Sequence, residues 1–213
     1  MALNKLKFNS LNVTPAASEA IRFNSSANGL ETASAGGSLV KISSTTASSS
    51  SSISFTSGID STYKEYIFIL NTIHPATDGT TINIDFSTDS GSSYSVTKTT
   101  TAFYAGQRDD AGDNFFSYAT GADIAQGTGS VVIQSVSGDN DHGAAAILHL
   151  FDPSNTTFVK NFILTTSITT DSNYISNNYS AGYCNTTSAI DAVKFSMASG
   201  NIDSGTIALY GVS

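Results

Sequence analysis

The residues best suited to chemistry lie in one short stretch, RDDAGDN, which runs from Arg108 to Asn114. Its three carboxylates belong to Asp109, Asp110 and Asp113. Ca²⁺ takes about six to eight hard oxygen ligands, which acidic loops can supply. The stretch does not match the known calcium-loop pattern, and acidic residues are also common in turns. Both interpretations stay open, and Ca²⁺ is the only cofactor that the sequence suggests.

Aromatic residues flank the acidic stretch, and they are a second candidate site. Aromatic rings can stack on the faces of sugars while Asn and Asp hydrogen-bond the hydroxyl groups. A surface glycan is therefore a candidate ligand, and the alternative is that these rings pack in a core or between subunits. The four residues are Tyr104, Phe115, Phe116 and Tyr118.

Catalytic motifs are missing from the sequence. His74, His142 and His149 have no mutual motif spacing, and neither H-E-x-x-H, C-x-x-C nor G-x-S-x-G occurs. The single cysteine, Cys184, has no histidine near it in sequence, which favours a small buried hydrophobic residue over a reactive thiol. We therefore expect a protein that is not an enzyme.

The composition restricts the partners of the chain. Only 12% of its 213 residues are charged, and the formal net charge is −8, so the surface must consist largely of Ser, Thr, Asn and Gly. Such a surface offers no basic patch for phosphates, which argues against nucleic acid and anionic membranes as partners. No apolar run approaches a membrane span, and MALNKLKFNS lacks the apolar region of a signal peptide. We expect synthesis and folding in a cytosol.

Short alternating segments dominate the chain and indicate an all-β sandwich or barrel. TINIDFS (81–87) and AVKFSM (192–197) alternate clearly, whereas Tyr66–Leu70 is continuously apolar, as in a central strand covered on both faces. One face of this strand would pack on the core, and a loop or another subunit would bury the other face. Further strands are predicted at Ser93–Phe103, Ser130–Val136, Ala144–Phe151, Thr157–Ser167, Tyr174–Tyr183 and Thr206–Val212.

Residues 1–37 differ from the rest, because their apolar positions are too sparse to build a core. LKFNS (6–10) recurs as IRFNS (21–25), by chance or as a structural repeat. If it is a repeat, neighbouring chains would have to bury its apolar residues, as in a homotrimeric stalk. The expected assembly contacts are Leu6, Phe8, Leu11, Val13, Ile21 and Phe23.

The serine run Ser48–Ser52 lies between two strand-like pieces, LVKI (39–42) and ISF (53–55). We therefore interpret it as a polar strand or strand corner at the edge of a domain, with a flexible hinge as the alternative. The domain boundary is placed earlier, at Gly36-Gly37. This gives an N-terminal attachment or stalk segment at 1–37 and a β-sandwich domain at 38–213.

Longer blocks carry a resemblance to a known group of proteins. They are DSTYKEYIFILNTIHPATDGT (60–80), LHLFDPSNTTFVKNF (148–162), AGYCNTTSAIDAVKFSMASGNIDSGTIALYGV (181–212) and the leader ASEAIRFNSSANGLETASAGG (17–37). Together they resemble virion structural proteins of tailed phages of marine bacteria, such as pelagiphages and cyanophages. The resemblance implies a non-enzymatic β-sandwich displayed on the particle beyond a short N-terminal attachment segment.

Residues and resemblance together lead to one expectation. The fold should be a jelly-roll-like antiparallel β-sandwich, and the protein a homotrimeric fibre or spike subunit of a virion assembled in the host cytoplasm. Its partners would be itself, other virion proteins through the N-terminus, and a host-surface glycan. The alternatives are a capsid decoration protein and a stand-alone carbohydrate-binding module.

Overall fold

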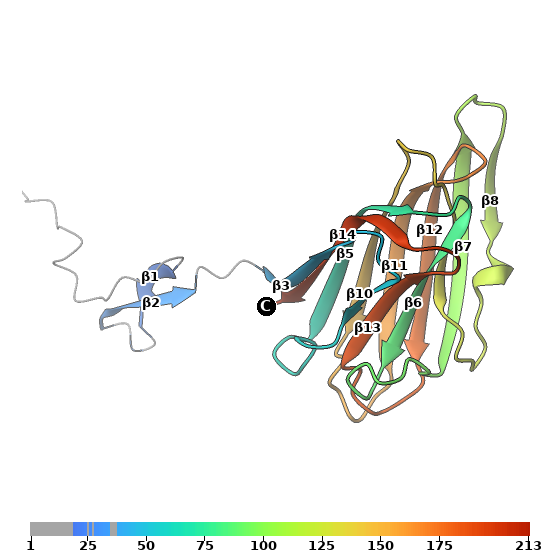
Figure 1. Ribbon diagram of the computed structural model, residues 1–213. Coiled ribbons are helices and arrows are strands. Elements are labelled where there is room, and N and C mark those ends of the chain that lie inside the picture. The colour runs from blue at the N-terminus through green and yellow to red at the C-terminus, as the bar shows by residue number, and fades with distance from the viewer. Residues whose placement is uncertain (1–18, 25, 27, 35–37) are drawn as a thin grey trace, which may run out of the picture. The chain divides into compact units, whose positions relative to one another are not determined.

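The computed structural model describes residues 19–24, 26, 28–34 and 38–213, and nearly all regular structure within them is β-strand (Figure 1). The chain divides into two compact units, Met1–Val40 together with Ser213, and Lys41–Val212. The Gly36-Gly37 pair, at which the sequence places the boundary, lies outside the described residues. Each unit is described by itself.

The N-terminal unit contains a two-stranded antiparallel hairpin of β1 (Glu19–Phe23) and β2 (Leu30–Ser34), in which Phe23 pairs with Leu30. The strands were not predicted, although Asn28-Gly29 is a dipeptide typical of tight turns. Of the six expected assembly contacts, Ile21 and Phe23 lie on β1, and Phe23 is 72% exposed. Leu6, Phe8, Leu11 and Val13 lie outside the described residues.

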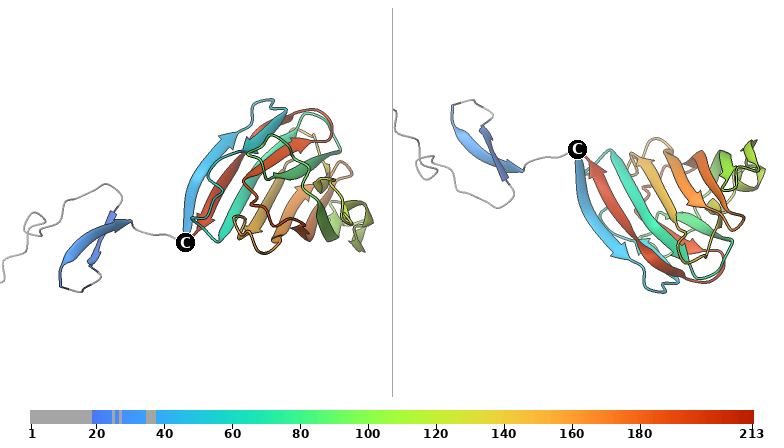
Figure 2. Two further views of the ribbon diagram at one scale, coloured as in Figure 1. Left: turned by 90° about the horizontal axis from the view of Figure 1, so that it is seen from below. Right: turned by 90° about the horizontal axis from the view of Figure 1, so that it is seen from above.

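The second unit consists of two antiparallel sheets. The order in the larger sheet is β3 (Leu39–Thr46), β14 (Ile202–Val212), β5 (Glu65–Pro75), β10 (Ala144–Phe151), β11 (Lys160–Thr169), β12 (Tyr174–Cys184), β7 (Lys98–Arg108) and β8 (Asn114–Tyr118). The order in the smaller sheet is β4 (Ser52–Phe55), β13 (Ala192–Met197), β6 (Thr80–Ser87) and β9 (Val131–Val136). Figure 2 shows the two sheets as separate layers.

The connectivity confirms the predicted jelly-roll-like sandwich. Strands β4 to β9, followed by β12 and β13, are divided between the two sheets as the eight strands of a jelly roll are, and successive strands change sheet except for the β7–β8 hairpin. The β10–β11 hairpin is inserted between β5 and β12, while β14 and β3 extend the sheet beyond β5. The larger sheet is therefore wider than the smaller one that packs on it.

The core lies between the sheets, where the inward residues of each alternating strand meet. Phe68 of the larger sheet contacts Phe55 and Phe195 of the smaller sheet, with ring centroids 5.3 and 5.5 Å apart. Phe86 and Phe162 form a second contact across the layers at 5.2 Å. Aromatic pairs of this kind add to the stabilisation from apolar burial.

The serine run forms the corner at which the chain passes from one sheet to the other. β3 ends at Thr46 in the larger sheet, and β4 begins at Ser52 in the smaller sheet. Backbone hydrogen bonds attach the corner to β14, including those from Ala47 to Gly205 (2.8 Å) and from Ser50 to Ile202 (2.8 Å). The strand-corner interpretation is confirmed, and the serines are not a hinge between domains.

The strand predicted at Ser93–Phe103 is displaced, because β7 begins at Lys98 and ends at Arg108. The preceding residues form a side-chain network instead of pairing in a sheet. Asp89 accepts hydrogen bonds from the Ser87 hydroxyl (2.7 Å) and from the Ser93 amide (2.8 Å) and hydroxyl (2.7 Å), which lower its pKa to about 2. Such local bonds compete with strand pairing.

Candidate functional site

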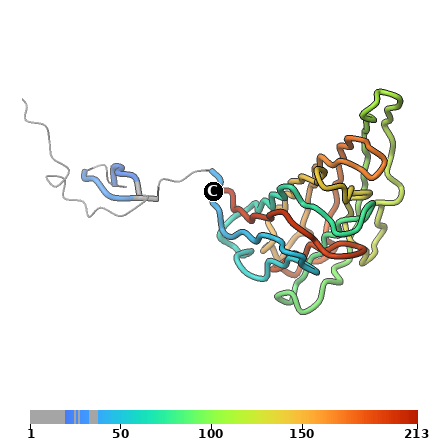
Figure 3. The backbone as a smooth tube through the Cα atoms, turned by 45° about the horizontal axis from the view of Figure 1, so that its top comes forward, coloured from blue at the N-terminus to red at the C-terminus, as the bar shows by residue number. Residues whose placement is uncertain are grey.

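A cleft with a volume of about 270 Å³ opens where the wider sheet meets the edge of the smaller one. β9 is the last strand of the smaller sheet, and β8 is the last strand of the larger sheet. The β7–β8 hairpin forms that end of the sandwich (Figure 3). Residues from β7, β8, β9 and β12 and from the β11–β12 turn line the cleft: Tyr104, Phe115, Gln134, Ser135, Thr170, Asp171, Ser172, Tyr174, Ser176 and Asn178.

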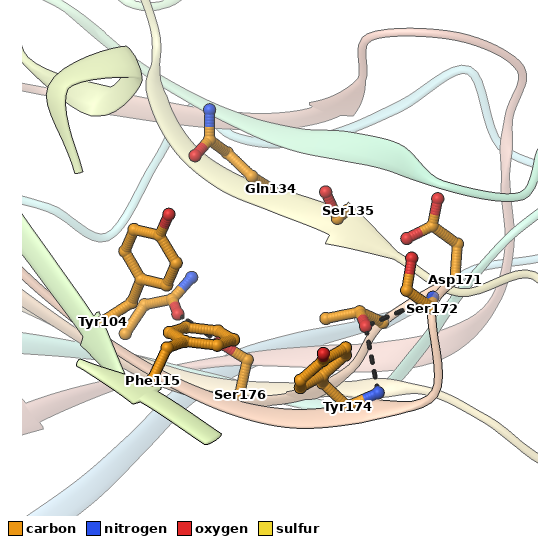
Figure 4. Close-up of a pocket in the computed structure, with 10 residues that line it drawn as sticks. Tyr104, Phe115, Gln134, Ser135, Asp171, Ser172, Tyr174 and Ser176 are labelled. Atoms are coloured by element: carbon orange, nitrogen blue, oxygen red, sulfur yellow. Dashed lines mark hydrogen bonds between the residues drawn. The ribbon is translucent and has the colours of Figure 1, made fainter. Parts of the chain in front are cut away.

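Three aromatic side chains lie next to one another on one side of the cleft (Figure 4). The ring of Phe115 is 5.1 Å from that of Tyr104 and 5.5 Å from that of Tyr174, measured between centroids. Phe115 pairs with Gly106 on β7, and a methyl group at Gly106 would overlap the Phe115 ring. Glycine at this position therefore lets the ring lie close to the backbone of β7.

Polar groups surround the aromatic rings. A β-bulge in β9 places Gln134 and Ser135 opposite the single residue Thr81, and Ser135 has a positive φ of 57°. In the β11–β12 turn, the Thr170 hydroxyl accepts hydrogen bonds from the amides of Ser172 (3.4 Å) and Tyr174 (3.2 Å) (Figure 4). These bonds fix the turn that carries Asp171.

Hydrogen bonds among neighbouring strand residues also fix the positions of Ser176 and Asn178 in the cleft lining. The Ser176 hydroxyl donates to Oδ1 of Asn178 (2.9 Å), and the backbone N–H of Asn178 donates to the Thr166 hydroxyl (3.2 Å). Asp171 is the only titratable carboxylate among the lining residues, which include no Lys, Arg or His. A pair of carboxylates, as used in most glycoside hydrolysis, is not part of this lining. The arrangement suits binding of a neutral polar molecule through stacking and hydrogen bonds.

The predicted aromatic residues lie on two different faces of the sheet. Tyr104 and Phe115 line the cleft, whereas Phe116 and Tyr118 are exposed on the outer face of the larger sheet. On that face Phe103 lies between Phe116 and Tyr179, at centroid distances of 5.6 and 5.2 Å. The four candidates are therefore not one site.

Sequence reasoning missed Tyr174, Gln134 and Asn178 as cleft residues. The alternation of the predicted strand Tyr174–Tyr183 does place Tyr174, Ser176 and Asn178 on one face. Nothing in the sequence indicates that this face lies beside Tyr104, because that depends on the pairing of β12 with β7.

The acidic stretch lies beside the cleft, and its carboxylates have different partners. Arg108 donates two hydrogen bonds to Asp110 (2.8 and 2.6 Å), which lower the pKa of Asp110 to about 2. Asp113 accepts a hydrogen bond from the Tyr174 hydroxyl (3.0 Å), while Asp109 lies at the start of the turn that joins β7 to β8. Within the described part of the chain, no group of three His, Cys, Asp or Glu side chains is arranged to hold a metal ion.

Comparison with protein-family models gives no match, and comparison with curated proteins gives none either. The described residues contain no helix with the length and hydrophobicity of a membrane span.

Proposed function

We propose that this protein is a non-enzymatic structural subunit of a tailed-phage virion, a fibre or spike whose jelly roll binds a glycan on the host surface. The aromatic cleft formed by Tyr104, Phe115 and Tyr174 is the observation that carries the glycan-binding role. The virion role rests on the sequence resemblance and on the hydroxyl-rich, weakly charged composition.

The cleft combines the two features that sugar recognition requires. Its rings offer apolar faces to the C–H side of a pyranose, and its amide, hydroxyl and carboxylate groups can bond sugar hydroxyls. Because the hydrogen bonds around Thr170 and Asn178 hold the cleft in place, little ordering would accompany binding.

The charge of the cleft favours a neutral sugar. Asp171 would repel the carboxylate of an acidic sugar, and no cation in the lining would offset that repulsion. We therefore expect neutral hexoses to bind in preference to uronic or sialic acids.

Tyr104→Ala is expected to weaken sugar binding by about tenfold, because both a stacking surface and a hydroxyl are lost. Binding can be measured by saturation-transfer NMR with the methyl glycosides of glucose, galactose and mannose. Tyr174→Ala should have a similar effect, since the Tyr174 ring lies next to Phe115 on the same side of the cleft.

Phe116→Ala is the matched control, because Phe116 is an aromatic residue of the same hairpin on the opposite face. Its binding should equal that of the unaltered protein. Equal loss in all three variants would contradict the cleft as the site, as would preferred binding of glucuronic acid.

The proposed assembly is a homotrimer held by the N-terminal segment, which also attaches the subunit to other virion proteins. Ile21 and the 72% exposed Phe23 on β1 present apolar surface that neighbouring chains can cover. Among the residues that the structure describes, every member of the hydrophobic core lies at position 42 or beyond, so deleting residues 1–37 removes none of these core residues.

Deleting residues 1–37 should convert a trimer into a smaller species, measured as native mass by light scattering beside the full-length chain. The circular dichroism of the truncated protein should retain its β-sheet signal. A full-length chain that is already monomeric would contradict the stalk and favour the capsid decoration protein as the alternative.

A further inference from the structure

The outer face of the larger sheet is almost free of charge. We define it by the outward-pointing residues of five adjacent strands, β10, β11, β12, β7 and β8. None of them is Asp, Glu, Lys or Arg, although the chain carries seventeen acidic residues. His149 is the single histidine of the face, and its Nδ1 lies 2.6 Å from Glu65 of the neighbouring β5.

Large apolar side chains are exposed across this face. Ile147, Ile163, Phe103, Phe116, Ile175 and Tyr179 are each at least 40% exposed, and Phe116 reaches 74%. The patch continues onto β5, where Ile67 and Ile69 are only half-buried although the sequence predicts a cover on both faces of this strand. Exposed apolar surface on this scale is typical of an interaction site.

The face also has hollows. One, of about 250 Å³, lies between Ile69, Ile147 and Ser167. Another, of about 400 Å³, lies along Phe151, Ile163 and Tyr183. The same face thus carries both projecting rings, such as the 74% exposed Phe116, and hollows that side chains of a facing surface can enter.

We propose that this outer face binds a second copy of the chain, so that the sandwich domains associate through their larger sheets. Two copies with a net charge of −8 repel each other over most of their surfaces, and the repulsion is smallest where neither carries a carboxylate. The face holds no charged residues that would select a different partner. This contact does not depend on whether the N-terminal segment trimerises.

The dimensions of the face suit a stable contact. Five strands spaced by about 4.8 Å, with about eight residues each rising about 3.3 Å, cover roughly 600 Å². Interfaces of ordinary size bury about 800 Å² per partner, and β5 adds further area. Packing of two such sheets resembles the face-to-face packing inside a β-sandwich.

Thiol labelling of the full-length chain tests this contact. Ser167→Cys places a thiol at the hollow on the outer face, and Ser54→Cys places one on the exposed side of β4 in the smaller sheet. The native Cys184 is buried and contributes little background. In the assembled protein, maleimide-polyethylene glycol should label Ser167→Cys about tenfold or more slowly than Ser54→Cys.

Adding Phe116→Ser to Ser167→Cys should restore fast labelling, because Phe116 is 74% exposed in the single chain, where it packs on Phe103, and its loss mainly weakens the contact between copies. Equal labelling rates at the two cysteines in an assembled protein would overturn the proposal while leaving the N-terminal trimer intact. A mass that stays monomeric at every concentration tested would overturn it as well, and would leave the face to a different partner.

Discussion

Replacing Phe195 by alanine is expected to lower the free energy of unfolding by about 3–5 kcal/mol. Phe195 is fully buried on β13 and contacts Phe55 and Phe68, with ring centroids 6.2 and 5.5 Å away. Its removal would leave a cavity between the two sheets and remove one of the aromatic contacts between them, that of Phe195 with Phe68. Urea denaturation followed by circular dichroism measures the change.

Phe158→Ala is the matched control for this variant, because Phe158 is 68% exposed in the loop before β11. Its effect should stay within about 0.5 kcal/mol. If both variants lose the same stability, Phe195 does not lie in the core that joins the sheets.

Alkaline pH should destabilise the protein through Cys184. The thiol is fully buried on β12, and burial raises its pKa from 9.0 to about 12. Its contribution to stability is fully present below pH 9, where the thiol is neutral in both states. Above pH 9 the unfolded chain ionises while the folded chain keeps its proton, so stability falls by about 1.4 kcal/mol per pH unit until about pH 12.

Cys184→Ala isolates this contribution. Burial lowers the pKa values of Lys98 and Lys160, which pair with Cys184 on the neighbouring strands, and these lysines titrate in both proteins. The stability difference between the two proteins should therefore shrink as pH rises from 9. Parallel curves of unfolding free energy between pH 9 and pH 11 would contradict the burial of the thiol.

Much of the fold follows from local pattern. The mostly apolar run Ala144–Phe151 predicts a strand with the bounds of β10, and the strict alternation of AVKFSM predicts one with the bounds of β13. One face of such a segment must be buried and the other left polar or exposed, so period-two hydrophobicity and a sandwich go together. The strands around Ser93 and Asn114 were harder to predict, because side-chain hydrogen bonds and short length obscure the pattern.

The sequence by itself determined the all-β class and most strand positions. It also separates Tyr104 from Phe103, and Phe115 from Phe116, because successive strand residues point to opposite faces. Only the tertiary structure decided that Tyr104 and Phe115 meet Tyr174 in a cleft while Phe116 joins Phe103 and Tyr179 outside. Strand order and register bring together residues that are far apart in the chain, and alternation within one strand carries no information about which strand will lie beside it.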